Sequence, residues 1–227
     1  MADLEALRRS YRRGELVEAD APDDPWTLFD RWFSDVQQAG LPEPNAMTLA
    51  TVDVHGRPHA RTVLLKGLVE AEGAPGGAGG SGGAQRTPQF FSNADSDKGQ
   101  QLAANPACAL LFTWLPLERQ VRIEGAARRL DAAREDGYFA SRPRGSQIGA
   151  WASAQSSVVE DRSQLQQRFA EAEQRFDGAA VPRPPHWGGW GVEVDAVEFW
   201  QGRDNRLHDR LRYVRDGAAW RRERLAP

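Results

Sequence analysis

Nine short segments rich in Val, Leu, Thr and aromatic residues recur along this chain, and they constrain its fold more than any other feature. Each has the length and composition of a β-strand, and turn-forming residues separate neighbouring segments within a group. The segments cover residues 46–52, 58–69, 89–92, 108–114, 119–130, 190–194, 197–201, 211–214 and 219–225. Strands grouped in this way predict antiparallel pairing, and we expect the sheet to curl into a barrel.

Helical patterns precede and interrupt these strands. Asp24 and Pro25 are typical of a helix start, and Gly40 of a helix end. Between them the apolar positions keep a helical spacing, at Trp26, Phe29, Trp32, Phe33 and Val36. Further helices are expected over residues 1–13, 97–104, 132–141, 146–152 and 160–176, with Ser96 and Asp131 as the caps of the second and third. The fold class predicted from the residues is therefore α+β.

The composition excludes several classes of protein. Of the 29 basic residues only Lys66 and Lys98 are lysines, and 32 acidic residues bring the net charge to −3. A protein that coats nucleic acid is usually strongly basic, so we expect no nucleic-acid partner. The single cysteine, Cys108, excludes an intrachain disulfide, and we expect no metal site. No apolar run is long enough for a membrane helix and residues 1–13 lack the apolar core of a signal peptide, which predicts a cytoplasmic protein.

The chain is expected to form one domain over residues 1–227. Two parts of it are predicted to be irregular. Residues 1–20 form an expected mobile N-terminal segment, and residues 71–88 an expected flexible loop, because 73–83 are nearly all Gly, Ala and Ser.

Three polar segments lie inside strand-like or helical surroundings. In the first, residues 61–66, Arg61 and Lys66 are five positions apart and so point to opposite faces of a regular strand. They could serve two sites if this strand lies at a subunit interface. Taken alone, the segment favours an exposed strand with charged ends.

The second polar segment covers residues 138–147. Tyr138 and Arg142 are four apart and share a helix face, and Ser146 begins the next predicted helix, where free N–H groups suit an anion. The three side chains could form a phosphate pocket. A helix cap with solvated arginines explains the same residues equally well.

The third polar segment covers residues 198–210. Arg206, His208 and Arg210 alternate, so on an extended strand they point to one side. Such a cationic face suits an anion, and Trp200 could stack on a planar ring. Together the three segments predict a ligand with phosphate and a flat ring.

Four longer stretches carry a resemblance to a known family. They are ARTVLLK at 60–66, LERQVRIEG at 117–125, YFASRPRGSQIGAWAS at 138–153 and EFWQGRDNRLHDR at 198–210, and the ending WRRERLAP is similar too. The chain resembles the pyridoxamine 5′-phosphate oxidase family from about residue 7 to residue 227. The resemblance implies an FMN-binding split β-barrel with flanking helices, assembled as a homodimer with FMN at the interface. It also implies oxidation of pyridoxamine and pyridoxine 5′-phosphate to pyridoxal 5′-phosphate, with oxygen as acceptor and release of hydrogen peroxide, a step of vitamin B6 metabolism.

The resemblance assigns residues to three roles. The FMN-binding set is Arg61, Thr62, Val63, Leu64, Leu65, Lys66, Phe91, Ser92, Lys98, Gln120, Gln155, Ser156, Trp200 and Arg210. The substrate-binding set is Lys66, Tyr138, Arg142, Ser146, Arg206 and His208, with Arg8 and Tyr11 expected to close over the site. Arg206 and His208 are the implied catalytic residues. They would hold the substrate ring against the flavin, and either could help to remove a proton.

Asp97 departs from the family pattern, which usually has two adjacent basic residues where this chain has Asp97 and Lys98. An acid beside a flavin phosphate repels it, so Asp97 either points away or weakens FMN binding. This departure leaves a second function open, that of a binding protein of the same barrel class without turnover. An arginine-rich nucleic-acid binder is a third possibility, which the net charge of −3 disfavours.

Overall fold

The computed structural model describes residues 10–70 and 85–227. In these ranges it contains five α-helices, nine strands and two short 3₁₀ helices. The helices are α1 (Pro25–Gln38), α2 (Asp97–Ala104), α3 (Ala132–Ala140), α4 (Arg144–Ala152) and α5 (Arg162–Arg175). The strands are β1 (Ala46–Val52), β2 (Pro58–Leu64), β3 (Gly67–Glu70), β4 (Arg86–Asn93), β5 (Ala107–Trp114), β6 (Arg119–Arg129), β7 (Trp187–Gln201), β8 (Asp209–Asp216) and β9 (Ala219–Arg224). The 3₁₀ helices are Leu115–Leu117 and Asp204–Arg206.

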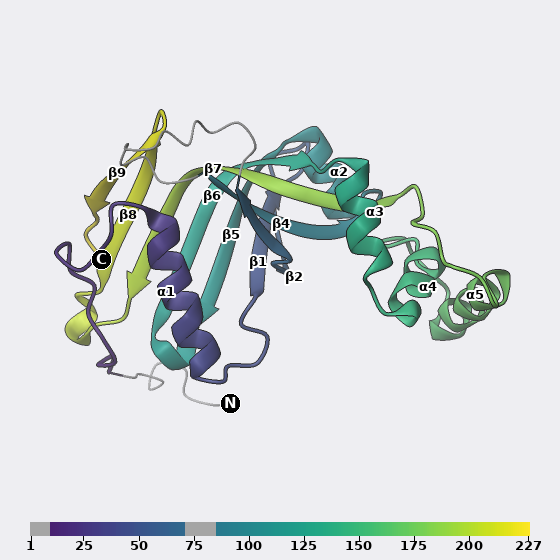
Figure 1. Cartoon of the computed structure of the whole chain (residues 1–227), viewed down its shortest axis with the longest axis horizontal. Helices are drawn as coiled ribbons and strands as arrows, with labels where there is room; N and C mark the ends of the chain where they lie inside the picture. The colour runs from purple at the N-terminus through teal and green to yellow at the C-terminus, as the bar shows by residue number, and fades with distance from the viewer. Residues whose placement is uncertain (1–9, 71–84) are drawn as a thin grey trace.

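All nine strands join one antiparallel sheet, as expected from their grouping along the chain. The main order is β2-β1-β5-β6-β7-β4-β3, and β8 and β9 extend the far end of β7. The sheet curls but stays open, because in the described part of the chain no ladder joins β2 to β3 or β4. Figure 1 shows the resulting body of twisted strands, with α1 packed across one side of it.

The segment expected as one strand over residues 58–69 is two strands. The chain leaves β2 after Leu64 and enters β3 at Gly67, on the opposite end of the sheet order. At the break the Leu65 N–H donates to the Asn45 carbonyl at 2.9 Å, and the Lys66 N–H donates to the Gln89 carbonyl at 2.8 Å. Backbone hydrogen bonds to Asn45, just before β1, and to Gln89 in β4 therefore fix the bend between Arg61 and Lys66.

The segments expected at 190–194 and 197–201 are instead one long strand, β7. The pairing of β7 with β6 shifts register between Glu124 and Gly125, which is a β-bulge. A Cβ added at Gly125 would lie 2.0 Å from the Glu193 carbonyl oxygen, so only glycine permits this close approach. The bulge, and not a gap between strands, accounts for the break in the hydrophobic pattern near residue 195.

Helix α1 forms where its cap and spacing predicted. Asp24 accepts a hydrogen bond from the Thr27 N–H at 2.9 Å, and Pro25 occupies the first helical position. The buried face of α1 includes Trp26, Phe29 and Trp32, which pack on the sheet. Burial of such large aromatic side chains supplies much of the apolar area that stabilises the sheet body.

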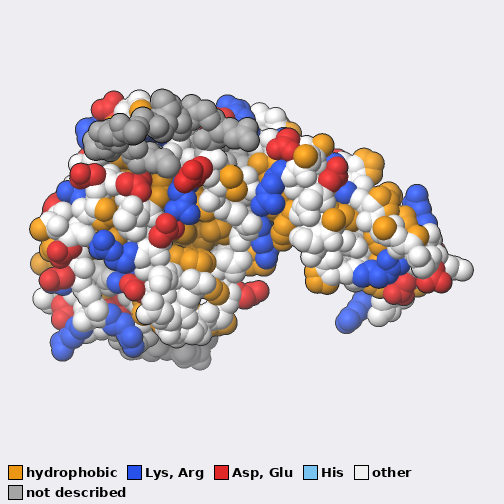
Figure 2. Space-filling view, viewed as in Figure 1, with side chains coloured by type: hydrophobic (Ala, Val, Ile, Leu, Met, Phe, Trp, Pro, Cys, Tyr) orange, Lys and Arg blue, Asp and Glu red, His pale blue; other side chains and the backbone are white. Residues whose placement is uncertain are grey.

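Helices α3, α4 and α5 form an arm that extends from the sheet (Figure 1). The N-caps are Ser96 for α2, Asp131 for α3 and Asp161 for α5, and the first two were predicted. The arm has its own small core around Phe139, Ile148, Phe176 and Trp187. Figure 2 shows the molecule hollowed between the sheet body and this arm.

The expected helix over residues 1–13 lies mostly outside the described residues, and Ser10–Arg13 form no helix. Residues 10–20 are not free of the body, because the Leu16 N–H donates to Asp209 at 3.0 Å and the Arg13 N–H to Glu118 at 2.9 Å. Of the loop expected over residues 71–88, 71–84 lie outside the described residues, whereas 86–88 already belong to β4. Among the described helices, none has the length and apolar character needed to span a bilayer.

Candidate active site

A cavity of about 480 Å³ lies where the sheet body meets the arm. Strands β2 and β4 and helices α2 and α4 contribute to its wall, together with residues at the end of α3 and at the start of β7. It is lined by Thr62, Val63, Leu64, Lys66, Phe91, Ser92, Asn93, Lys98, Tyr138, Arg142, Ser146, Gly149, Ala150, Ser153, Gln155 and Trp187. Two of the three polar segments singled out in the sequence therefore meet in one space.

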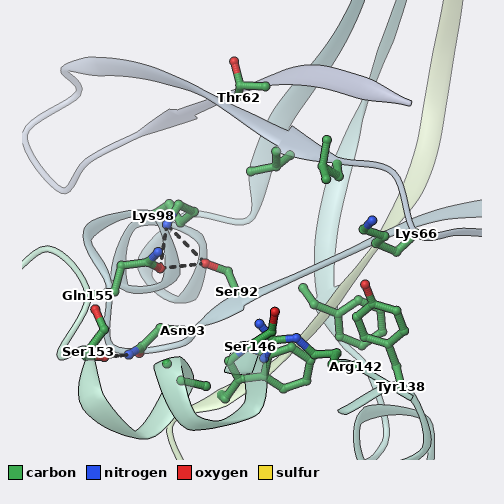
Figure 3. A pocket seen from close by; sticks show the side chains of 16 residues that line it. Thr62, Lys66, Ser92, Asn93, Lys98, Tyr138, Arg142, Ser146, Ser153 and Gln155 are labelled. Carbon is green, nitrogen blue, oxygen red and sulfur yellow. Dashed lines mark hydrogen bonds between the residues drawn. The ribbon is translucent and has the colours of Figure 1, made fainter. Parts of the chain in front are cut away.

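Lys98 lies on one side of this cavity (Figure 3), where it is surrounded by acceptors. Its Nζ donates to Gln155 Oε1 at 2.9 Å, to Ser92 Oγ at 3.1 Å and to Ser96 Oγ at 3.3 Å. Burial lowers the pKa of Lys98, the nearby Arg61 lowers it further, and Asp97 opposes the shift. A half-buried ammonium among hydroxyl and amide groups is suited to bind an anion such as a phosphate.

A second group of polar side chains lies on the other side of the cavity and contains Lys66, Tyr138, Arg142 and Ser146 (Figure 3). Among the described residues, Arg142 Nη1 is buried without a hydrogen-bond partner. Burial lowers the pKa of Arg142 and raises that of the Tyr138 hydroxyl, which stays protonated and able to donate. A half-buried guanidinium with a buried, unused donor is suited to bind an anionic ligand.

Apolar rings support this second group. Phe91 stacks on Tyr138 at 4.0 Å between centroids and on Trp187 at 5.4 Å, and the Arg142 guanidinium lies 4.9 Å from the Trp187 ring centre. Trp187 was not predicted as a site residue. It directly precedes a Gly-Gly pair, and glycines in a strand pattern are a signal of close approach that the sequence contains.

Arg61 and Leu65 are the two members of the 61–66 segment that do not line the cavity. The Arg61 guanidinium donates to Thr51 Oγ1 of β1 at 2.5 Å and to Gln101 Oε1 of α2 at 3.0 Å. Burial lowers the pKa of Arg61. The two ends of the segment therefore face different surroundings, and the reason is the bend at residue 65, which turns Lys66 toward the cavity, and not the parity of a regular strand.

Three members of the expected flavin set lie elsewhere, around a second cavity of about 290 Å³. They are Gln120, Trp200 and Arg210. Arg210 donates to Glu198 Oε1 at 2.8 Å and to the Ala226 carbonyl at 2.9 Å, and the bond to Glu198 raises the pKa of Arg210. Within one chain, therefore, these three residues do not line the first cavity.

Ser156 and Asp97 line a third cavity, of about 500 Å³, which shares Asn93 and Gln155 with the first. Ser156 Oγ accepts a hydrogen bond from the Asp97 N–H at 3.2 Å, and Ser156 has a left-handed φ of 73°. The Asp97 side chain does not line the first cavity. It still acts on the cavity through charge, because it partly offsets the lowering of the pKa of both Lys98 and Arg61 by burial.

The expectation that Arg206, His208 and Arg210 share one face of a strand is wrong. Asn205 and Arg206 adopt left-handed φ values of 56° and 62° in the 3₁₀ helix Asp204–Arg206, and only Arg210 lies in β8. Arg206 is exposed and His208 half-buried. A left-handed non-glycine residue stores strain of the kind found at functional sites, so this turn is a candidate for a functional loop.

His208 is held in a defined orientation. The Arg203 N–H donates to His208 Nδ1 at 3.1 Å, so the neutral ring carries its proton on Nε2. The His208 ring lies 4.6 Å from Trp200 and 5.7 Å from Tyr11 between centroids. Burial and the charge of Arg206 lower the pKa of His208. Neutral His208 therefore presents a donor, not a base. Arg8 lies outside the described residues.

Other reactive groups are sparse in the described residues. They contain no group of three or more His, Cys, Asp or Glu side chains that could hold a metal. Burial raises the pKa of the Cys108 thiol to about 11, so the thiolate is scarce at neutral pH.

Comparison with known proteins identifies this arrangement. Residues 33–176 match the family model described as pyridoxamine 5′-phosphate oxidase, and residues 187–227 match the model of the pyridoxine 5′-phosphate oxidase C-terminal dimerisation region. The chain belongs to the pyridoxamine 5′-phosphate oxidase family. It is therefore a member of an oxidoreductase family, and its open antiparallel sheet with flanking helices is the split-barrel fold predicted for it.

Relatives of this family member share its full length. The pyridoxine/pyridoxamine 5′-phosphate oxidase of Rubrobacter xylanophilus is 53% identical over 225 residues, which cover 99% of this chain and 97% of that protein. The protein of the same name from Ectopseudomonas mendocina is 54% identical over 226 residues, covering 99% and 98%.

Solved structures agree with the fold. PhzG from Burkholderia lata 383, in complex with tetrahydrophenazine-1-carboxylic acid, has a TM-score of 0.80 and 31% identity, covering 93% of this chain and 98% of that one. A pyridoxamine 5′-phosphate oxidase-related, FMN-binding protein from Nostoc punctiforme has a TM-score of 0.67 at 14% identity, covering 90% and 98%, a likeness in fold alone.

Proposed function

We propose that this protein is an FMN-dependent oxidase that converts pyridoxamine 5′-phosphate and pyridoxine 5′-phosphate to pyridoxal 5′-phosphate. Oxygen is the acceptor and hydrogen peroxide is released. The reaction supplies pyridoxal phosphate in the biosynthesis and salvage of vitamin B6. The names of relatives 53% and 54% identical over nearly the whole chain support this substrate class.

One observation carries the proposal: a single cavity of about 480 Å³ holds two separate groups of cationic and hydroxyl side chains. The group around Lys98 is suited to the FMN phosphate, with Ser92 and Gln155 beside the ammonium. The group around Arg142 is suited to the substrate phosphate, and its buried, unpartnered Nη1 marks the place of an absent acceptor. A flavin and a phosphorylated ring require two such ends.

The side chains around Arg142 bind and orient the substrate. Lys66, Arg142 and the Tyr138 and Ser146 hydroxyls donate to the phosphate. Fixing the phosphate at this end leaves the ring of the substrate to extend toward the middle of the cavity. Bound FMN supplies the hydride acceptor there, and the protein contributes position more than strong acid or base catalysis.

Completion of the site needs a second copy of the chain. Gln120, Trp200 and Arg210 line a cavity apart from the first one. His208 lies beside Trp200 of that second cavity, and Arg206 is close enough to His208 to act on it through charge. The match of residues 187–227 to a dimerisation region supports a homodimer. In the proposed dimer, FMN lies at the interface between the first cavity of one chain and the second cavity of its partner. Arg206 and His208 would then reach the substrate across that interface.

Purified protein tests the activity directly. We expect a yellow protein with flavin absorbance bands, and peroxide release with pyridoxamine 5′-phosphate but far less with unphosphorylated pyridoxamine. A colourless protein that takes up no added FMN would overturn the cofactor assignment. A yellow protein without turnover would favour the binding-protein alternative.

A mixed dimer tests the shared site. Lys98→Ala removes a side chain of the first cavity, and Arg210→Met removes a side chain of the second. In a homodimer of either variant, both shared sites are therefore damaged. A heterodimer of the two variants carries both defects in one site and none in the other. We expect it to recover about half of the wild-type flavin content and activity. Sites built within one chain would give no recovery at all.

A further inference from the structure

A buried carboxylate behind the substrate end of the cavity has no role in the function proposed above. Glu135 in α3 is 3% exposed. Its Oε1 accepts from Arg129 Nη2 at 2.7 Å and from the Gly189 N–H at 2.9 Å, and its Oε2 pairs with Arg183 Nη1 at 3.0 Å. One side chain thus joins helix α3 to strand β6, to the start of β7 and to the loop before it.

The backbone of β7 is shaped for this carboxylate. A Cβ added at Gly188 would lie 2.2 Å from Arg129 Nη2 and 2.3 Å from Glu135 Oε1. A Cβ added at Gly189 would lie 2.7 Å from the Phe91 ring. The two glycines therefore let the strand approach both the ion pair and the ring that stacks on Tyr138.

Four arginines lie close to this wall. Arg134 donates to Gln89 Oε1 at 2.9 Å, and Glu135 divides the other three into two classes. Arg129 and Arg183 bind Glu135, and Arg183 also donates to the Trp187 carbonyl at 2.7 Å. Arg142 is not bound to Glu135 and keeps a buried Nη1 without a partner among the described residues. The carboxylate thus occupies two of the guanidinium groups and leaves the third available.

The same carboxylate sets the position of the substrate-binding groups. Tyr138 follows Glu135 by one helical turn in α3, and Arg142 lies just beyond the end of that helix over the Trp187 ring. The bond from Gly189 to Glu135 fixes the helix against the strand that carries Trp187. A shift of α3 would therefore move Tyr138 and Arg142 relative to the rest of the cavity.

We propose that Glu135 is a positioning residue for recognition of the substrate phosphate, which rests on the proposed function of the cavity. It holds α3 against β7 and keeps Arg129 and Arg183 engaged, so that Arg142 alone of the three meets the phosphate. Glu135 itself touches no substrate atom.

Glu135→Gln tests the proposal in the FMN-loaded enzyme. The amide keeps the shape but cannot pair with both arginines, so we expect KM for pyridoxamine 5′-phosphate to rise about tenfold, the size of one charge-assisted hydrogen bond. We expect kcat to change less than about twofold, since phosphate binding is equal in ground and transition states. FMN affinity should be unchanged. Asp136→Asn is the control, because the exposed Asp136 also binds Arg183, and it should keep the wild-type KM.

Three outcomes would overturn the proposal. A lower KM in Glu135→Gln would show that removal of a negative charge near the phosphate, and not the position of α3, controls substrate binding. An unchanged KM with a lower melting temperature would show a purely structural ion pair. A KM raised by Asp136→Asn to the same degree would show a general effect of freeing Arg183. If Glu135→Gln does not fold, Glu135→Asp, which is too short to reach all three partners, should raise KM in the same direction.

Equilibrium dialysis of pyridoxal 5′-phosphate and of pyridoxal gives a readout without turnover. Glu135→Gln should weaken binding of the phosphorylated compound about tenfold and leave the weak binding of pyridoxal unchanged. Equal weakening of both would refute the proposal. Wild-type protein that neither binds pyridoxal 5′-phosphate nor oxidises pyridoxamine 5′-phosphate would refute the proposed function, whereas wild-type binding that Glu135→Gln leaves unchanged would refute this inference alone.

Discussion

Phe91 and Tyr138 stack with ring centroids 4.0 Å apart and planes 22° apart, which joins strand β4 of the sheet to the arm. The stack holds the Tyr138 hydroxyl at the cavity while the ring provides the packing. The two contributions of this residue can therefore be separated by experiment.

Tyr138→Phe removes the hydroxyl and keeps the stack. We expect KM for pyridoxamine 5′-phosphate to rise about tenfold, the value of a hydrogen bond to a charged group, with little change in melting temperature. Phe91→Ala removes the stack itself and should lower the free energy of unfolding by about 3 kcal/mol. Steady-state kinetics and thermal melts distinguish the two. An unchanged KM in Tyr138→Phe would show that the hydroxyl does not bind the substrate.

Arg206 is expected to trade stability for function, because its φ of 62° is costly for a side chain. Arg206→Gly relieves about 1–2 kcal/mol of strain and adds about 0.5–1 kcal/mol of chain entropy to the unfolded state. The variant should therefore be as stable as wild type, or slightly more so. The single-turnover rate of flavin reduction should fall about 100-fold, as it should in Arg206→Ala, which keeps the strain. If neither Arg206→Ala nor His208→Ala slowed that step, both residues would lose their catalytic assignment.

The orientation of His208 predicts a pH dependence of kcat/KM. Protonation of Nδ1 sets a second donor against the Arg203 N–H, so the turn should hold only while the ring is neutral. The pKa of His208 is lowered, so the fold favours the neutral ring. Its contribution to stability is complete above the unfolded value near 6.5 and is lost as the pH falls toward the lower folded pKa. We expect kcat/KM to fall over the same acidic range.

Two substitutions separate the nitrogens of His208. His208→Asn places an amide oxygen near the Nδ1 position and should keep the turn while removing the acidic inflection. His208→Gln places its polar group near Nε2 and should lose the bond from Arg203. A pH profile that keeps the same inflection in His208→Asn would assign the titration to another group.

Asp97 should weaken FMN binding through charge alone. Its side chain lies at the neighbouring cavity but acts electrostatically on Lys98 and Arg61. Because the carboxylate is exposed, Asp97→Asn should strengthen FMN binding only about two- to fivefold, and Asp97→Arg somewhat more. Fluorescence titration at low and high salt measures this, and the gain should shrink with salt. Asp95→Asn at the same cavity is the control. A loss of affinity in Asp97→Arg would show that Asp97 has a role of its own.

The parts of the fold predicted from sequence are those with local signals. Helix α1 was expected from Asp24, Pro25 and its apolar spacing, and the caps Ser96 and Asp131 located two further helices. The bend at Leu65 had no such signal, because its hydrogen-bond partners, Asn45 and Gln89, are remote in sequence. The same holds for Glu135, whose partners Arg183 and Gly189 come from a later part of the chain.

The candidate site was predicted in composition but not in arrangement. The resemblance supplied most residues of the cavity, and strand parity already separated Arg61 from Lys66, yet no local signal predicted the bend that turns Lys66 toward the cavity. The prediction that Arg206, His208 and Arg210 alternate along a strand failed because the chain makes a left-handed turn at Arg206. The neighbouring Asn205 is a residue type that tolerates such a conformation. Side chains that face the cavity from another element, such as Trp187, need the tertiary structure.

The open edge of the sheet has a consequence for how long the folded protein persists in the cell. The cavity is walled by β2 and β4, which lie near opposite ends of the strand order and share no ladder in the described residues. FMN bound there, as proposed, would join the two ends, and its binding free energy would add to the resistance of the fold to unfolding. A shortage of FMN would then reduce the amount of folded protein, through faster proteolysis, as well as the proposed activity.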